Sequence, residues 1–358
     1  MKAKTSFSLV AIFMGVVFLA AMKIEYEHTK LGEKFQRRER KEWRENLAGL
    51  PLGIVHWESD LELRPLWDDN SKPKDNTARL SALLAMAVGI SQKKNVDTVV
   101  NKFLNANCSI ILFHYDGNVN EWRDLDWSDG VVHIVAHNQT KWWFAKRFLH
   151  PDIVSIYDYI FLWDEDLGVE NFDPGRYMQL MFSEGLEISQ PALDPELSSE
   201  IHHRITVRDR KVKVHRRVYD YRGSLNCSDE SKGPPCTGWV EGMAPVFSRA
   251  AWKCVWHLIQ NDLIHGWGLD MKLGYCAQGD RTKKVGVINS EFIVHLGIPT
   301  LGGASSNKAV SQRSLDLRTH IRRQSTAELE KFKERWNRAV RDDKEWSDRF
   351  ESLSRRKG

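Results

Sequence analysis

Three consecutive acidic residues, Asp164-Glu165-Asp166, directly follow an apolar run from Tyr159 to Trp163. This run predicts a buried parallel strand, and open α/β sheets bind their ligands at the carboxyl ends of such strands. Because neighbouring carboxylates repel one another and resist desolvation, this position favours a bound cation. The simplest chemistry is an Asp-x-Asp sequence, Asp164 and Asp166, that holds a divalent metal against a sugar-nucleotide diphosphate. The alternative is an acidic turn that caps the next segment.

A histidine is the next candidate for binding a metal. His295 ends the apolar run from Phe292 to Val294, which predicts a second strand end. Neutral imidazole is a good metal ligand, and two aspartates with one histidine suit manganese better than magnesium. We therefore predict a divalent cofactor, manganese, bound by Asp164, Asp166 and His295. The alternative is a structural histidine at a strand end.

The segment from His265 to Asp270 combines two glycines, a tryptophan and a carboxylate. Gly266 and Gly268 permit an unusual turn, and Trp267 offers a flat face to a sugar ring. Asp270 opens a predicted helical segment, where its carboxylate can take a proton from an acceptor hydroxyl. Asp270 is the expected base if the reaction inverts the anomeric centre, whereas a retaining reaction requires no dedicated base. Helix N-capping is the alternative role.

Further residues are candidates for contacts with a nucleotide-sugar donor and a glycan acceptor. The donor candidates follow a predicted strand end or carry charge that would neutralise a diphosphate; they are Tyr115, Asp116, Arg281 and Lys284. The acceptor candidates are Trp239, Glu241 and Trp267. For the basic residues, an exposed loop is the alternative.

Three longer stretches resemble the plant family called domain of unknown function 707: FLWDEDLGVENFDPGRY, GPPCTGWVEGMAPVFSRAAW and LIHGWGLDMKLGYCAQGD. The resemblance covers most of the chain from about residue 50 to 303. That family resembles GT-A glycosyltransferases, which implies that Asp164 contacts ribose or metal and that Asp166 and His295 contact the metal. The segment from Gly266 to Asp270 is similar to the Gly-Trp-Gly acidic motif of galactosyltransferase-like enzymes. Leu269 replaces one of the two carboxylates usual in that motif.

An uncharged apolar segment, Phe7 to Met22, lies near the N-terminus after Lys2 and Lys4. It is slightly shorter than the ~20 residues that cross an average bilayer, and the thinner membranes of the early secretory pathway reduce this mismatch. We interpret it as a signal-anchor, because Leu19 fits poorly to the small-residue rule of a cleaved signal peptide, which is the alternative. Positive charge keeps residues 1–6 cytoplasmic and places the rest of the chain in the lumen.

Lumenal exposure has consequences for asparagines and cysteines. The acceptor sequons begin at Asn107, Asn138 and Asn226. The chain has five cysteines, so one is left over if the others form disulfides. Cys227 and Cys236 flank a polar loop and are the expected bridge. Cys254 with Cys276 is a second pairing, which leaves Cys108 as a buried thiol. Five reduced thiols in a cytosolic protein are the alternative.

Composition and periodicity divide the chain of 358 residues, which is 42% hydrophobic and has a net charge of +4. This charge gives no case for nucleic-acid binding. Residues 23–49 are dense in charge and predict a lumenal stem. Residues 50–303 alternate apolar runs with helical segments, which predicts a GT-A-like, Rossmann-related α/β domain with a mixed, mainly parallel sheet flanked by helices.

Two segments of the second half have patterns of their own. Alternating apolar and basic residues from Ile201 to Val218 predict a hairpin. Residues 304–358 predict a charged helical extension in which Ser325 to Glu328 form a capping box. An apolar stripe follows that box, and we expect it to pack on the core or on a partner.

These observations predict a Golgi type II membrane glycosyltransferase-like protein. It would transfer a sugar from a metal-bound nucleotide-diphosphate donor to a glycan or cell-wall acceptor. One alternative is a non-catalytic glycan-binding or scaffolding protein of the Golgi. Another is a glycoside or phosphoester hydrolase that uses the acidic cluster.

Overall fold

The computed structural model describes residues 22–23, 25–26, 30, 49–55, 80–219, 227–298 and 308–348, with residues 308–318 described by their backbone only. The chain divides into two compact units, Met1–Ala48 and Gly49–Gly358. The predicted signal-anchor and stem lie almost wholly outside the described residues. Among the described residues, no helix has the length and apolar content that a membrane crossing requires.

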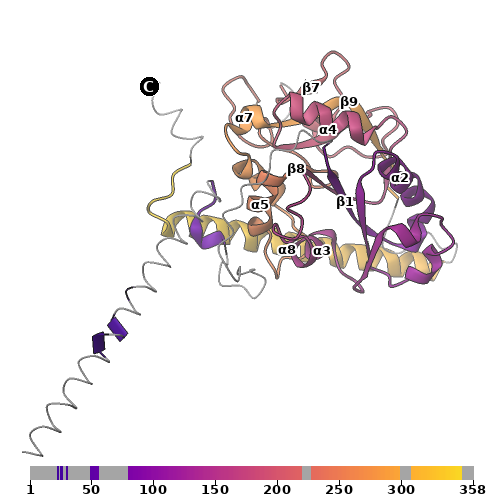
Figure 1. Ribbon diagram of the computed structural model, residues 1–358, viewed down its shortest axis with the longest axis horizontal. Helices are drawn as coiled ribbons and strands as arrows, with labels where there is room; N and C mark the ends of the chain where they lie inside the picture. Colours follow the sequence, from indigo (N-terminus) through magenta and orange to yellow (C-terminus); the bar gives the residue numbers. More distant parts are fainter. Residues whose placement is uncertain are drawn as a thin grey trace, which may run out of the picture. The chain divides into compact units, whose positions relative to one another are not determined.

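The second unit contains a nine-stranded mixed sheet in the order β3-β2-β1-β4-β8-β6-β9-β5, with β7 paired to β9 (Figure 1). The strands are β1 (Ala82–Val88), β2 (Ser109–His114), β3 (Val132–Val135), β4 (Tyr159–Trp163), β5 (Leu167–Gly168), β6 (Ile188–Leu193), β7 (Val214–His215), β8 (Val246–Ser248) and β9 (Val285–His295). The pairings β1–β2, β1–β4, β2–β3 and β6–β9 are parallel and are the longest ones. The predicted mainly parallel α/β sheet is confirmed.

The direction of the strands decides which ends meet at one edge. Strand β8 is antiparallel to both β4 and β6, so β4 and β6 run in the same direction. Strand β9 is parallel to β6. The carboxyl ends of β4 and β9 therefore lie at the same edge of the sheet, and these ends carry Asp164 and His295.

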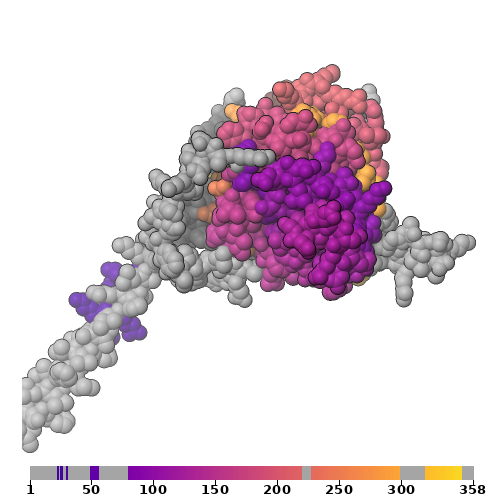
Figure 2. Space-filling model, turned by 45° about the vertical axis from the view of Figure 1, so that its right-hand side comes forward, coloured from indigo at the N-terminus to yellow at the C-terminus, as the bar shows by residue number. Residues whose placement is uncertain are grey.

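Helices cover the sheet and connect its strands. The α-helices are α2 (Lys93–Asn105), α3 (Lys141–Phe148), α4 (Pro174–Ser183), α5 (Arg249–Leu258), α6 (Asp270–Leu273), α7 (Arg281–Lys284) and α8 (Lys308–Asp342). The 3₁₀ turns are η1 (Leu52–Ile54), η2 (Ile90–Gln92), η3 (Val119–Trp122), η4 (Ser128–Gly130), η5 (Arg204–Thr206) and η6 (Gly274–Cys276). Figure 2 shows the packed surface of this unit, with the first half of the chain in purple and magenta facing the viewer.

Aromatic side chains fix β4 in the core. Phe103 of α2 packs edge-on against Phe161 and Trp163 of β4, with ring centroids 5.1 and 5.4 Å apart. Phe172 lies against the same rings. Because all five residues of β4 are buried, the strand end at Asp164 has a rigid base.

Two predictions about the second half are wrong. The segment from Ile201 to Val218 is not a hairpin, because Val207 pairs with Leu193 of β6 and β7 pairs with β9. The alternating pattern reflects strand pairing to more distant parts of the chain. Ser325 to Glu328 form no capping box, because they lie inside α8, where the Ser325 hydroxyl donates to the Ile321 carbonyl.

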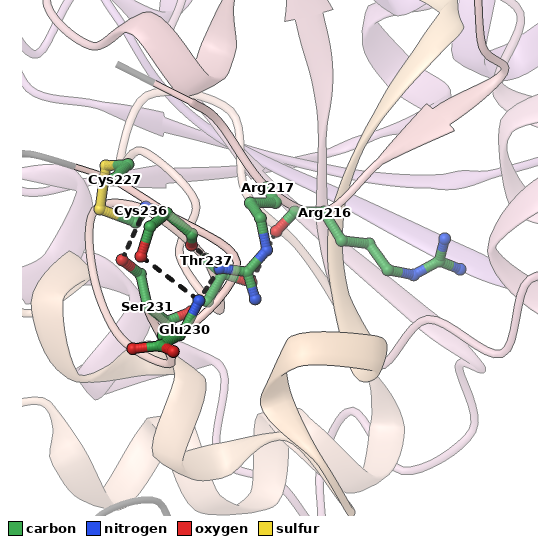
Figure 3. Close-up of a disulfide and its surroundings, with 8 residues drawn as sticks. Arg216, Arg217, Cys227, Glu230, Ser231, Cys236 and Thr237 are labelled. Atoms are coloured by element: carbon green, nitrogen blue, oxygen red, sulfur yellow. Dashed lines mark hydrogen bonds between the residues drawn. A yellow bond between two sulfur atoms is a disulfide. The ribbon is translucent and has the colours of Figure 1, made fainter. Parts of the chain in front are cut away.

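Two disulfides are present, Cys227–Cys236 and Cys254–Cys276, and Cys108 is a buried thiol outside both. Figure 3 shows the first disulfide closing a loop onto which Arg217 reaches; its Nη1 donates to the carbonyls of Ser228 and Ser231. Disulfides persist in oxidising compartments, so both bridges fit a domain of the secretory pathway.

Candidate functional site

The three carboxylates after β4 have different partners. Glu165 is buried, and its Oε2 accepts the Gly89 N–H at 2.7 Å while its Oε1 accepts the Tyr115 hydroxyl. Desolvation raises the pKa of Glu165 to about 8. Burial and the Glu165 charge likewise raise the pKa of Tyr115 far above its usual value. Glu165 thus joins the ends of β1, β2 and β4, and the hydroxyl of Tyr115, a donor candidate, is used in this contact.

Asp164 has a buried lysine as its partner. Lys141 Nζ lies 2.7 Å from Asp164 Oδ1, with the two side chains 7% and 44% exposed. Nζ also donates to the carbonyls of Gly242 and Met243, at 2.5 and 3.3 Å. Desolvation raises the pKa of Asp164, and the Lys141 charge opposes this rise. A lysine in the first turn of a helix opposes the helix dipole, so the carboxylate and the carbonyls are what stabilise it there.

Asp166 pairs with His295. The distance from Asp166 Oδ2 to His295 Nε2 is 3.2 Å, and His295 Nδ1 donates to the Glu200 carbonyl at 2.8 Å. The hydrogen bond that His295 donates to Asp166 is the main cause that raises the pKa of His295 to about 9, against the effect of burial. The two residues meet because β5 pairs with β9, with Leu167 opposite His295.

Glu241 is a buried carboxylate at the same edge, 7% exposed. Within the described part of the chain, its Oε2 has no hydrogen-bond partner, whereas its backbone N–H donates to Gln190 Oε1 at 2.5 Å. Desolvation raises the pKa of Glu241 to about 7. Four charged groups then modify this pKa: His295, Asp270, Asp164 and Lys141. Glu241 immediately precedes Gly242, whose carbonyl accepts from Lys141 Nζ, so this segment lies against the Lys141–Asp164 pair.

Asp270 is the first residue of α6 and does not cap it, because Leu269 is at the N-cap position. Its Oδ1 accepts the neighbouring Met271 N–H at 2.8 Å. Desolvation raises the pKa of Asp270 to about 6. The turn before it depends on Gly266 and Gly268, at φ 68° and 91°. A Cβ on Gly266 would lie 2.4 Å from the Trp142 ring, so the turn also requires close contact with α3.

The acceptor candidates divide by exposure. Trp267 is 46% exposed, so its ring is accessible to a sugar. Trp239 is buried and packs against the His203 ring at 4.4 Å between centroids. The ring of Trp239 is therefore not exposed to a sugar. The neighbouring His202 ring lies 6.2 Å from that of His295.

The donor candidates also divide. Asp116 is partly exposed at the end of β2, and its Oδ2 accepts the Ile90 N–H at 2.7 Å. Lys284 precedes β9, at the opposite edge of the sheet from His295. The pairing of β6 with β9 between them covers six residues of β6, or about 17 Å at ~3.3 Å per residue.

Arg281 is buried by a packed loop. Its Nε donates to the Lys232 carbonyl at 2.8 Å, and its guanidinium lies 4.9 Å from the centre of the Tyr275 ring. The positive charge beside the β4 end therefore comes from Lys141 and His295. Lys141 was not predicted as part of the site; the signal that could have indicated it is a lysine in the first turn of a helix, where it opposes the helix dipole.

Two of the predicted glycosylation residues are described. Asn107 and Asn138 are both exposed and have positive φ angles of 61° and 58°. Asn226 lies outside the described residues.

Two side chains that contact each other, Asp166 and His295, are available as ligands for a divalent metal. In the described residues, no group of three or more His, Cys, Asp or Glu side chains has the geometry of a metal site. Asp166 and His295 form a pair, and the Glu200 carbonyl fixes the histidine so that Nε2 faces the aspartate. Such an outer hydrogen bond is typical of histidines that bind metals. A third ligand from Asp164 requires that its carboxylate leave Lys141.

Fold and site together define an α/β protein with a charged, partly buried site at the carboxyl edge of a mixed sheet. Residues 41–342 match the family described as "Protein of unknown function (DUF707)", and the chain belongs to this family. No curated protein matches the sequence.

Solved glycosyltransferases are among the similar structures. The mannosyltransferase Ktr4p from S. cerevisiae is 13% identical over 44% of this chain and 50% of its own, with a TM-score of 0.25. The structure of this enzyme in complex with GDP is 12% identical over 44% of this chain and 51% of its own, with a TM-score of 0.24. The bifunctional glycosyltransferase WbbM is 11% identical over 62% of this chain and 39% of its own, with a TM-score of 0.32. The chain thus covers about half or less of each, and likenesses at these scores carry no argument about function.

Proposed function

We propose that the unit from Gly49 onward transfers a sugar from a nucleotide-diphosphate donor to a glycan or cell-wall acceptor. The observation that carries this proposal is the set of charged side chains at the carboxyl edge of the sheet, where Lys141 pairs with Asp164 and His295 pairs with Asp166. One site there holds two carboxylates with raised pKa values, Glu241 and Asp270. It also holds two cations, Lys141 and His295, paired to Asp164 and Asp166.

Sugar transfer needs both kinds of group. The bond between the anomeric carbon and the diphosphate breaks, and the diphosphate leaves with the bonding electrons and its negative charge. The cations Lys141 and His295 stabilise negative charge that develops near them. The acceptor hydroxyl forms the new bond and gives up its proton, which an ionised Asp270 takes in an inverting reaction. Trp267 places its exposed ring where a sugar can stack.

A manganese ion would be held by Asp166 and by the neutral imidazole of His295, with Asp164 as the third ligand, so the charge of the metal would replace that of the protonated histidine. Bound there, the metal would supply positive charge that neutralises the leaving diphosphate. Glu165 takes no part, because its carboxylate is buried and satisfied by Gly89 and Tyr115. The ring of Tyr115 and the Asp116 carboxylate remain our candidates for contact with the nucleoside.

The test is hydrolysis of nucleotide sugars by the full chain with and without manganese. Asp166→Ala should abolish any manganese-dependent turnover. Asp124→Ala is the matched control, because Asp124-Leu125-Asp126 has the same spacing but Asp124 is exposed and pairs with Lys93. Equal turnover by the wild type and Asp166→Ala contradicts the metal assignment.

We also propose a Golgi, type II membrane location with the site in the lumen. The two disulfides support an oxidising compartment. Exposure of Asn107 and Asn138 leaves both sequons accessible. Removal of N-glycans should increase the gel mobility of the protein, and replacing both asparagines with glutamine should remove most of that change. A protein whose mobility never changes was not exposed to the lumen at these positions.

A non-catalytic glycan-binding or scaffolding protein is the second candidate. It is favoured by the partners that already compensate Asp164 and Asp166, which are Lys141 and His295. Titration calorimetry separates the two functions. A transferase gives manganese-dependent heat with a nucleoside diphosphate, whereas a scaffold gives heat with a glycan alone.

A further inference from the structure

Helix α8 contacts the loop from Asp262 to Tyr275 along the stretch from Glu328 to Trp336. Glu328 of α8 accepts the His265 N–H through Oε2 at 2.9 Å, and its Oε1 lies 3.0 Å from His265 Nδ1. The Glu328 side chain is 8% exposed. A buried carboxylate is destabilising unless it is paired, so the pairing of Glu328 requires that His265 stay in this position.

The backbone of the loop presses directly on α8. A Cβ on Gly268 would lie 2.7 Å from the Leu329 side chain and 3.2 Å from Phe332. Gly268 also has a φ of +91°, which other residues rarely adopt. The turn that precedes Asp270 is therefore shaped by the surface of α8.

Contacts with α8 are present on both sides of Asp270 in the sequence. Before it, Arg335 holds Asp262 through two hydrogen bonds of 2.6 Å. After it, Tyr275 packs on Trp336 with 5.0 Å between ring centroids, and Lys272 lies 4.3 Å from the centre of the Trp336 ring. Helix α8 (yellow in Figure 1) thus contacts the loop at several points.

The opposite side of the loop is fixed to α3, the helix that carries Lys141. The Thr140 hydroxyl donates to the Ile264 carbonyl, and the Trp142 ring fills the space beside Gly266. The loop is therefore held between α3 and α8. Since Lys141 binds Asp164, both the loop and the Asp164 carboxylate are attached to α3.

We propose that α8 is a positioning element of the site and that Glu328 acts through His265 to hold Asp270 in place. This inference rests on the proposed function, because it assigns α8 a role in the same reaction. Glu328 is a positioning residue, since its contacts are with the loop. The apolar stripe predicted for this C-terminal region packs on the loop that leads to Asp270.

The test compares Glu328→Ala and Glu328→Gln with Glu330→Gln in the full chain. Glu330 is on the same helix but pairs with Lys333 in an exposed position. Hydrogen exchange of the backbone amides from residue 262 to 276 should become at least about tenfold faster in Glu328→Ala, because the loop opens locally. Exchange in β4 should stay unchanged. The amide of Glu328→Gln keeps an acceptor for His265 N–H, so an intermediate effect is expected.

Turnover supplies the second readout. In Glu328→Ala, kcat for donor hydrolysis should fall by about tenfold to a hundredfold, because small displacements of a catalytic group are costly. The donor KM should stay within about twofold, since Asp116 and the Asp164 region are untouched. Exchange that stays at the wild-type rate in the loop, or that rises equally in the loop and β4, overturns the proposal. If the wild type has no turnover, the proposed function fails and the exchange rates alone decide the role of α8.

Discussion

Two sets of carboxylates share one edge of the sheet and differ in their partners. Asp164 and Asp166 each contact a cation of the protein, Lys141 and His295. In the described residues, the Oε2 of Glu241 has no hydrogen-bond partner at all. The first set follows β4 in sequence. The second set consists of Glu241, on a loop, and Asp270, at the start of α6, which tertiary packing brings to the same edge. A cluster of acidic residues in a sequence therefore does not identify the carboxylates that are available for proton chemistry.

Desolvation raises the pKa of Asp164 in the first set and of Glu241 in the second, but the charges around these two carboxylates differ. Burial raises the pKa of Asp164, and Lys141 opposes it with a full positive charge. Burial raises the pKa of Glu241 to about 7, and around it the charges of Asp270 and Asp164 oppose those of His295 and Lys141. The paired carboxylates hold the geometry of the site, whereas Glu241 and Asp270, with pKa values raised to about 7 and about 6, can gain and lose a proton near neutral pH.

The largest effect is expected at Asp270, in the second set. Asp270→Asn should lower turnover by about a hundredfold to a thousandfold, because a general base typically contributes that much. Wild-type activity should rise with pH through about 6, the raised pKa of Asp270, since only the ionised carboxylate accepts a proton. This limb of the pH profile should be lost in the variant. Asp129→Asn, an exposed carboxylate of η4, should change neither value.

A smaller effect tests the first set. Lys141→Met removes the cation from Asp164 and leaves the carbonyls of Gly242 and Met243 without their donor. Because Lys141 is buried but Asp164 is half-exposed, the loss is expected to lower the free energy of unfolding by about 2 kcal/mol, less than for a fully buried ion pair. Urea unfolding at neutral pH measures the change.

Asp164→Asn provides the control for Lys141. The two substitutions should be less than additive in a double-mutant cycle, because each removes the same contact. Additive effects mean that the pair contributes nothing to the fold and that Lys141 does not compensate Asp164.

The next effect concerns how stability changes with pH. The folded-state pKa of Glu241 is raised from 4.5 to about 7, so the folded protein binds this proton more tightly than the unfolded chain does. The contribution is fully present below pH 4.5 and is lost as pH rises to about 7. Glu241→Gln should therefore stabilise the protein at pH 8 by about 2 kcal/mol and have little effect near pH 4. Unfolding curves that shift equally at both pH values contradict the buried, ionisable state.

The sequence predicted the frame of the site better than its charges. The five residues of β4 form the predicted strand, because a continuous apolar run of that length is typical of a buried strand. Lys141 was not predicted as part of the site, since its contacts with Asp164 and Met243 span 23 and 102 positions of the chain. The predicted hairpin failed for a related reason. Val214 alternates like a hairpin residue, but its partner is Ile288 of β9, which local periodicity cannot identify.

The smallest expected effect separates Glu165 from both sets. Tyr115→Phe removes the hydroxyl that Glu165 accepts and should lower the free energy of unfolding by about 1 kcal/mol, the usual contribution of such a hydrogen bond. Because the Gly89 N–H still binds the other carboxylate oxygen, Glu165 keeps its place and turnover should change little. Chemical unfolding of Tyr115→Phe, Glu165→Gln and the double variant measures the coupling between the two side chains. A large loss of turnover without loss of stability in Tyr115→Phe would instead place the hydroxyl in contact with the donor and move Glu165 into the reacting part of the site.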